Sequence, residues 1–104
     1  MEQNQDEIVR VKLPRNQQTL GIVEKRLGGA RMTIKCLDNK ERICRIPGAK
    51  RRSLWVREGN IVLVEPWELQ GDKKGDVIYK YSKSQIQWLR RKGYLQSLEE
   101  RDEF

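Results

Sequence analysis

The stretch RMTIKCLDNKERICRI, residues 31–46, decides the fold. In its first half Met32, Ile34 and Cys36 alternate with polar residues, so one side of an extended chain is apolar. The dipeptide that follows, Asp38-Asn39, is typical of a turn. The second half alternates again. The whole stretch therefore predicts a β-hairpin, two antiparallel strands joined by a short turn.

Three further segments have the apolar and β-branched composition of short strands, at residues 19–27, 60–65 and 77–81. Turn signals separate them, because Gly28-Gly29 follows the first segment and Pro47-Gly48 ends the hairpin. Five short strands at regular spacing favour a small barrel or sandwich over a helical bundle. Their number and the basic character of the chain match a mainly β, five-stranded OB-fold barrel.

The segment after the last strand predicts one helix, over residues 82–95. Ser82 can cap its first turn with Gln85 three residues on, and Ser84 offers an alternative start. The cations of the last turn complement the helix dipole, which is their ordinary role, so a contact of theirs with nucleic acid comes second. Gly93 suits the left-handed position that ends a helix.

We expect the barrel to span residues 19–81, between two short ends. Residues 1–18 are polar and predict a mostly flexible N-terminal tail, and residues 96–104 form an acidic C-terminal end.

The net charge of the chain is +7, but residues 1–7 and the acidic end each have a net charge of −3. The segment between them therefore has a net charge of +13. A field of this sign attracts polyanions. The alternative is a surface that uses lysine and arginine only for solubility.

The 104-residue chain has no histidine, two cysteines and no long apolar run. Without histidine the commonest proton shuttle and metal ligand is missing, and two cysteines cannot supply the four ligands of a zinc site. The sequence has no phosphate-binding glycine loop and no carboxylate pair beside a nucleophile, so we expect neither catalysis nor a cofactor or metal. The lack of an apolar run argues against a membrane span or a secretory signal and predicts a cytoplasmic protein.

Both cysteines fall on apolar faces of the hairpin strands. Buried reduced thiols are the first expectation for Cys36 and Cys44. A disulfide between them remains an alternative if the turn places the two residues directly opposite each other. A cytosolic setting argues against that bond, except in a hyperthermophile.

The densest positive charge surrounds the end of the hairpin. Arg42 and Arg45 come from its second strand, and the glycine-led connection that follows carries a run of cations. Arginine donates bidentate hydrogen bonds to phosphate and stacks on bases, so this region predicts an RNA-binding surface, with a merely solvated face as the alternative. The residues assigned to this surface are Arg31, Arg42, Arg45, Lys50, Arg51, Arg52, Trp55, Lys73 and Lys74.

Some of these assignments leave alternatives open. Trp55 follows the basic connection and either stacks on a base or packs in the core. Lys73 and Lys74 lie in the loop QGDKKGD, residues 70–76, where two aspartates flank them. They either contact an RNA backbone or belong to a solvated turn. The cations around the first hairpin, Lys25, Arg26, Arg31 and Lys35, are expected to extend the same surface.

Three segments in succession resemble the translation initiation factor 1A family. They read CLDNKERICRI (36–46), PGAKRRSLWV (47–56) and NIVLVEPWELQGDKKGDVIYKY (60–81), and the resemblance covers most of the chain, from about residue 20 to residue 95. It implies an OB-fold barrel with a following helix, and a protein that is not an enzyme. It also implies binding at the aminoacyl-tRNA site of the small ribosomal subunit. The implied partners are small-subunit RNA, the initiator tRNA complex and other initiation factors.

Carried over by position, the resemblance places Arg51 and Arg52 on basic positions of the family's loop. Arg42 falls on a basic strand position and Arg31 directly after the first hairpin turn. Ser53 stands where eukaryotic members often have another cation. The short acidic ends fit an archaeal member, so we do not expect the functions of the long eukaryotic tails. We expect the chain to act as a monomer.

Three other functions compete with this one. A general single-stranded RNA-binding protein or RNA chaperone of the cold-shock type is also a small barrel. Such proteins use several exposed aromatic residues on a strand face, whereas the single phenylalanine here is the last residue. A small hydrolase or nuclease would need the histidine or carboxylate cluster that the sequence lacks. A protein-only adaptor would not bind ribosomes at moderate salt.

Overall fold

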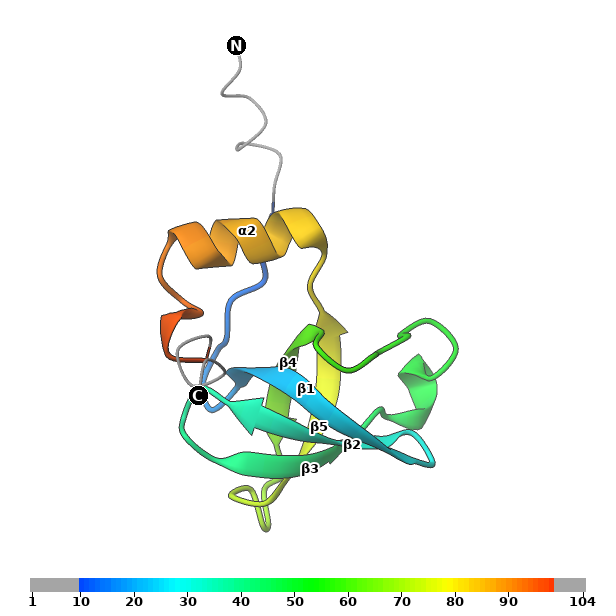
Figure 1. Ribbon diagram of the computed structural model, residues 1–104. Coiled ribbons are helices and arrows are strands. Elements are labelled where there is room, and N and C mark those ends of the chain that lie inside the picture. Colours follow the sequence, from blue (N-terminus) through cyan, green and yellow to red (C-terminus); the bar gives the residue numbers. More distant parts are fainter. Residues whose placement is uncertain (1–9, 99–104) are drawn as a thin grey trace.

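The computed structural model describes residues 10–98 (Figure 1). Five strands close into one barrel in the order β1-β2-β3-β5-β4, and all neighbours are antiparallel except β3 and β5, which are parallel. The predicted OB-fold barrel with a C-terminal helix is confirmed. The elements are β1 (Thr19–Gly28), β2 (Arg31–Cys36), β3 (Glu41–Arg45), the 3₁₀ helix η1 (Gly48–Lys50), β4 (Ile61–Pro66), β5 (Lys74–Lys80) and α2 (Lys83–Arg91).

Strand β1 is long, and it pairs with β2 along one edge and with β4 along the other. A register shift between Val23 and Lys25 interrupts its ladder with β2, and such a shift bends and twists a strand. At position 21 the Cβ of any residue other than glycine would lie 2.5 Å from Cγ2 of Ile34. Gly21 therefore permits the close approach of β1 and β2 on which the closed barrel depends.

The barrel interior takes the apolar face that the alternation of the sequence predicts. Met32, Ile34 and Cys36 of β2 are at most 1% exposed, and Cys44 of β3 packs with them. Ile43, the residue before Cys44, lies outside the barrel and is 39% exposed. Alternation therefore identifies these strands and also assigns each residue to a side of the sheet.

Helix α2 lies across one end of the barrel, above a second apolar cluster (Figure 1). Leu89 of the helix and Leu95 and Leu98 beyond it are fully buried. They pack with Leu20 of β1 and Leu63 of β4. The helix and the residues that follow it therefore cover the end of the barrel that its own five strands leave open.

The helix is shorter than the predicted segment 82–95. It begins with the predicted capping box, in which Ser82 and Gln85 exchange hydrogen bonds. It ends at Arg91, and Gly93 (φ +84°) takes the left-handed conformation that suits a helix end. In the part of the chain that the structure describes, no helix is long and apolar enough to cross a membrane.

The chain before β1 is tied to the helix and to the barrel. The hydroxyl of Tyr81 donates to the carbonyl oxygen of Lys12, and Nε2 of Gln85 donates to the carbonyl oxygen of Arg10 at 2.8 Å. The sequence predicts a mostly flexible tail over residues 1–18. From residue 10 on, this segment has no helix or strand but makes these contacts. Its first nine residues and the last six of the acidic end lie outside the described part of the chain.

Both cysteines are free and buried. In the β2–β3 register Cys44 faces Met32, whereas Cys36 lies four positions further along β2. The two cysteines are not directly opposite, so the condition for a disulfide is not met. The structure agrees with the expectation of reduced thiols inside the barrel.

We expect neither thiol of the folded protein to react with Ellman's reagent at mildly alkaline pH. Burial, with a smaller contribution from Cys36, raises the pKa of Cys44 to about 12, so its thiolate is scarce. Denaturant should expose both thiols together and allow both to be labelled. Fast labelling of one thiol under native conditions would contradict the placement of both in the core.

Candidate nucleic-acid interface

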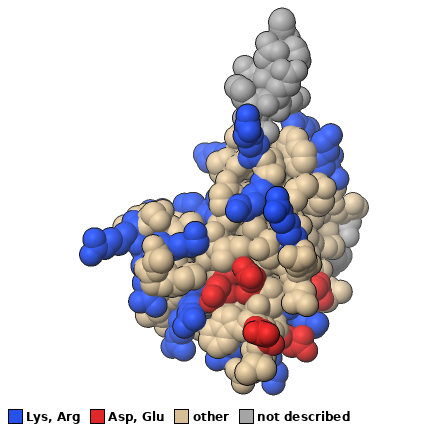
Figure 2. Space-filling view, turned by 180° about the vertical axis from the view of Figure 1, so that it is seen from behind, with Lys and Arg blue, Asp and Glu red and all other residues tan. Residues whose placement is uncertain are grey.

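Positive charge gathers where β1 turns into β2 and where the connection from β3 to β4 lies beside that turn. Arg26 and Arg31 flank the turn, and with Arg51 and Trp55 of the connection they line one cavity of about 200 Å³. Figure 2 shows basic side chains projecting from this side of the molecule, with acidic side chains gathered lower on the same face. We call this region the basic end. Arg26, Arg31, Arg51 and Trp55 line its cavity, and Lys80 contacts the connection. We include the cations next in sequence to the residues that line the cavity, which are Lys25, Lys50, Arg52 and Arg57.

Trp55 projects from the basic end into solvent. Its side chain is 75% exposed, whereas its neighbours Leu54 and Val56 turn inward, and Val56 is only 6% exposed in the barrel core. Of the two alternatives for this tryptophan, core packing is therefore wrong. An exposed indole beside arginines is suited to stacking on an unpaired base.

The connection from β3 to β4 has contacts that fix its shape. After the short helix η1, Nε of Arg51 donates to the carbonyl oxygen of Ile46 at 3.1 Å. From β5, Nζ of Lys80 donates to the carbonyl oxygen of Trp55 at 2.6 Å. A connection held in this way loses less conformational entropy when it binds a ligand.

Acidic side chains compensate only part of the positive charge in and beside this region. Arg31 of β2 lies directly opposite Arg45 of β3, and like charges in that arrangement destabilise a sheet. Arg45 has a partner in Asp76, at 3.1 Å. The side chains of Arg31, Lys50 and Arg52 make no ion pair or hydrogen bond within residues 10–98. A bound phosphate would therefore meet donors on Arg31, Lys50 and Arg52 that have no other partner among these residues.

A second tryptophan lies next to Arg45 on the outer face of the barrel. Nε1 of Trp67 donates to Oδ1 of Asp76 at 2.9 Å. The ring has two cations near it, with Cζ of Arg45 at 4.9 Å and Nζ of Lys74 at 5.8 Å from its centroid. Cation–π contacts hold both side chains against the ring. Arg45 and Lys74, both assigned to the RNA surface from the sequence, are therefore brought together.

The assignment of Arg42 to this surface is wrong. Its side chain is 3% exposed, and its guanidinium donates to both carboxylate oxygens of Asp38, at 2.8 and 3.1 Å. Its Nε donates to the carbonyl oxygen of Gly71 at 2.6 Å. Burial opposes the positive charge of Arg42, but its interactions with Asp38 and Cys36 together outweigh burial and raise the pKa of Arg42 above its ordinary value. Buried Arg42 therefore links the β2–β3 turn, through Asp38, to the β4–β5 connection, through Gly71.

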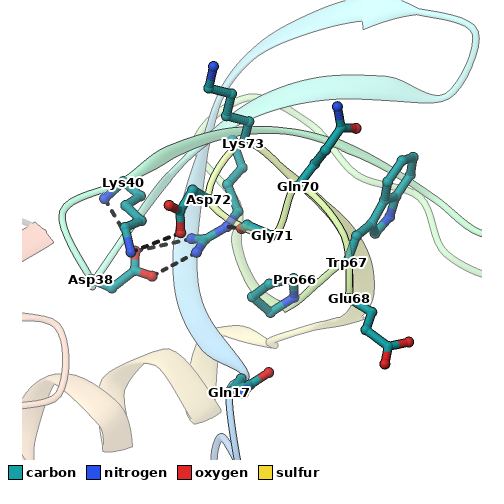
Figure 3. A pocket seen from close by; sticks show the side chains of 11 residues that line it. Gln17, Asp38, Lys40, Pro66, Trp67, Glu68, Gln70, Gly71, Asp72 and Lys73 are labelled. Atoms are coloured by element: carbon teal, nitrogen blue, oxygen red, sulfur yellow. Dashed lines mark hydrogen bonds and ion pairs between the residues drawn. The ribbon is translucent and has the colours of Figure 1, made fainter.

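Lys73 lies away from the basic end. It lines a groove of about 660 Å³ with Lys40 and Asp72, which form an ion pair at 3.1 Å (Figure 3). Gln17, which precedes β1, lines the same groove, whereas the basic end gathers where β1 ends. The groove carries charges of both signs. Its geometry favours a solvated turn for Lys73 rather than an RNA contact.

Sequence reasoning missed Arg57, Lys80 and Trp67. Lys80 is 25 residues away from Trp55, and only the closed barrel brings β5 against the connection. Trp67 lies between Pro66 and Glu68, so the sequence gives no sign that two cations lie on its ring. The alternation of β5 is a signal that Lys80 points outward, but it does not identify the carbonyl group that Lys80 binds.

The chemistry of the basic end is that of polyanion binding. Its described side chains offer guanidinium and ammonium donors for phosphates, an exposed indole for a base, and a small cavity between them. Within residues 10–98 no three His, Cys, Asp or Glu side chains are grouped so that they could hold a metal ion.

Comparison with known proteins points to one family. The family model described as translation initiation factor 1A / IF-1 matches residues 8–103. Over 88 residues the chain is 50% identical to translation initiation factor 1A of Pyrococcus abyssi, covering 85% of this chain and 78% of that protein. It is 51% identical over 88 residues to translation initiation factor 1A of Methanococcus aeolicus, covering 83% and 84%.

A solved structure agrees with these relatives. The solution structure of a bacterial translation initiation factor, from the Wolbachia endosymbiont of Brugia malayi, superposes with a TM-score of 0.52 and 30% identity, over 66% of this chain and 82% of that one. These relatives are named as initiation factors, which confirms the expectation of a protein that is not an enzyme. The chain belongs to the translation initiation factor 1A / IF-1 family.

Proposed function

We propose that the chain binds RNA of the small ribosomal subunit at the aminoacyl-tRNA site and promotes the binding of initiator tRNA. The observation that carries this proposal is the basic end, where Arg31, Lys50 and Arg52 lack ion partners among the described residues and Trp55 is 75% exposed. Phosphate contacts of these cations supply most of the affinity. The shape of folded RNA and a stacked base supply the specificity.

The proposed mechanism is steric and electrostatic rather than chemical. With the basic end on the RNA, the barrel occupies space that an elongator tRNA would need, so the subunit stays open to the initiator tRNA complex. On this proposal the chain acts as a monomer in the cytoplasm, alongside other initiation factors. Archaeal small subunits are the partner to test, since the relatives at about half identity are archaeal.

Co-sedimentation with purified archaeal small subunits over a salt series tests the proposal. We expect binding that saturates at one chain per subunit. The logarithm of the association constant should fall against the logarithm of salt concentration with a slope steeper than about −3, because several phosphates release counterions. Elongator tRNA added in excess should displace the chain.

A single-stranded RNA without structure is the matched control. Equal affinity for this RNA and for the subunit would replace the proposal by a general RNA-binding protein of the cold-shock type. If the chain did not bind subunits at moderate salt, a protein-only adaptor would replace the proposed function. Saturable binding that elongator tRNA does not reduce would place the contact outside the aminoacyl-tRNA site.

A further inference from the structure

The exposed position of Trp55 depends on how the connection around it is held. Leu54 and Val56 anchor the chain on either side, since both pack against the barrel core. Between these anchors the backbone of one residue carries an indole that is 75% exposed. Apolar anchors fix where the chain passes. They do not by themselves fix the direction of the peptide unit between them, which keeps the conformational freedom of a loop.

Lys80 supplies a polar contact at that peptide unit. It is the last residue of β5 and pairs with Val62 of β4, so its backbone is fixed in the barrel. Its Nζ donates to the carbonyl oxygen of Trp55 at 2.6 Å. Because the donor is charged, this hydrogen bond is stronger than one between neutral groups. The contact therefore extends the rigidity of the sheet to the exposed tryptophan.

We propose that Lys80 is a positioning residue, which holds Trp55 in the orientation that an RNA base stacks upon. This inference rests on the proposed function, in which Trp55 contacts RNA. On this inference Lys80 contributes to binding through Trp55, because its Nζ donates to the carbonyl oxygen of that residue. A direct phosphate contact by the two remaining N–H groups is the alternative that the experiment must separate. It differs in this from Arg31 or Arg52, whose side chains have no partner within the described residues.

A double-mutant cycle separates positioning from a direct phosphate contact. Lys80→Met is expected to weaken small-subunit binding about 5-fold in the wild-type background and less than about 2-fold in the Trp55→Ala background, because contacts that act together are not additive. Lys80→Arg keeps a charged donor and should stay within about 2-fold of the wild type. Lys25→Met is the matched control, since Lys25 is an exposed lysine of the basic end without a hydrogen bond to the connection among the described residues.

The outcomes decide between the two roles. If Lys80→Met costs the same in both backgrounds, as we expect of Lys25→Met, Lys80 is a phosphate contact and the inference fails. NMR relaxation of the Trp55 indole N–H in the free protein adds a test that needs no ribosome. Lys80→Met should lower its order parameter while Lys25→Met leaves it unchanged, and an unchanged order parameter in Lys80→Met would also overturn the inference. A wild-type chain that does not bind subunits would instead refute the proposed function.

Discussion

Arg51→Glu/Arg52→Glu is expected to lower the affinity for small ribosomal subunits by about 100-fold or more. Hydrogen bonds to charged groups contribute about 1.5–3 kcal/mol each, and a reversed charge adds repulsion from the phosphates. Arg51 also supports the connection through the carbonyl oxygen of Ile46. The single variant Arg52→Glu therefore isolates the electrostatic effect. Co-sedimentation over a salt series is the measurement, and the salt slope should become less steep in both variants.

The matched control is Arg15→Glu/Lys73→Glu. It makes the same change in net charge with exposed side chains near the start of β1, away from the basic end. We expect only a few-fold loss, because exposed charges further apart than the Debye length of about 8 Å are largely screened at physiological salt. Equal losses in the two double variants would mean that net charge governs binding and that the basic end is not the contact.

Asp38→Asn is expected to lower the free energy of unfolding by about 2–3 kcal/mol. The substitution keeps the size of the side chain but leaves the guanidinium of Arg42 nearly fully buried without its carboxylate. The cost lies below that of a wholly buried pair because the side chain of Asp38 is 37% exposed. Urea unfolding followed by circular dichroism measures it. Asp72→Asn is the control, since its exposed ion pair with Lys40 should contribute less than about 1 kcal/mol.

The same pair predicts a pH dependence. Burial works to raise the pKa of Asp38, but the hydrogen bond and charge of Arg42, with smaller contributions from Lys40, outweigh burial and hold this pKa below its ordinary value of 3.8. The stabilisation is therefore complete above pH 3.8 and is lost as the pH falls through the lower pKa of the folded state. The unfolding free energies of the wild type and of Asp38→Asn should converge in that acidic range. A constant difference at every pH would contradict the ion pair.

The strands could be predicted from the sequence because their signal is local. A residue such as Ile34 faces the core because its neighbours on either side are polar, and this pattern needs no knowledge of distant residues. The parallel contact between β3 and β5 has no such pattern, since it joins Ile43 to Lys74 across 31 positions. Only the strand count and the family resemblance pointed to the closed barrel. The helix end differs for a similar reason, because Leu95 packs on the barrel from the turn that follows Arg91.

The site was predictable where it is continuous in sequence and not where folding assembles it. The structure places Arg51 and Trp55 together with Arg31, as the run of cations and the first turn suggested. Arg42 shares the alternation of Cys44, so its position in the strand already indicates the barrel interior. Its charge predicted an exposed position. Asp38, a residue of the turn before β3, supplies the carboxylate that stabilises the guanidinium in the interior.

Strand β5, the last strand of the barrel, lies between β3 and β4, which do not pair with each other. Strand β5 pairs with both β3 and β4, so a nascent chain that ends at Gly71 has two strand edges without partners. Closing the barrel then needs contacts between distant parts of the chain, which are slow to form, and unpaired edges invite aggregation in the meantime. The protein cannot complete its fold until β5 has left the ribosome that makes it. Since Lys80 ends that strand, the barrel and the contact to Trp55 are completed in the same late step of synthesis.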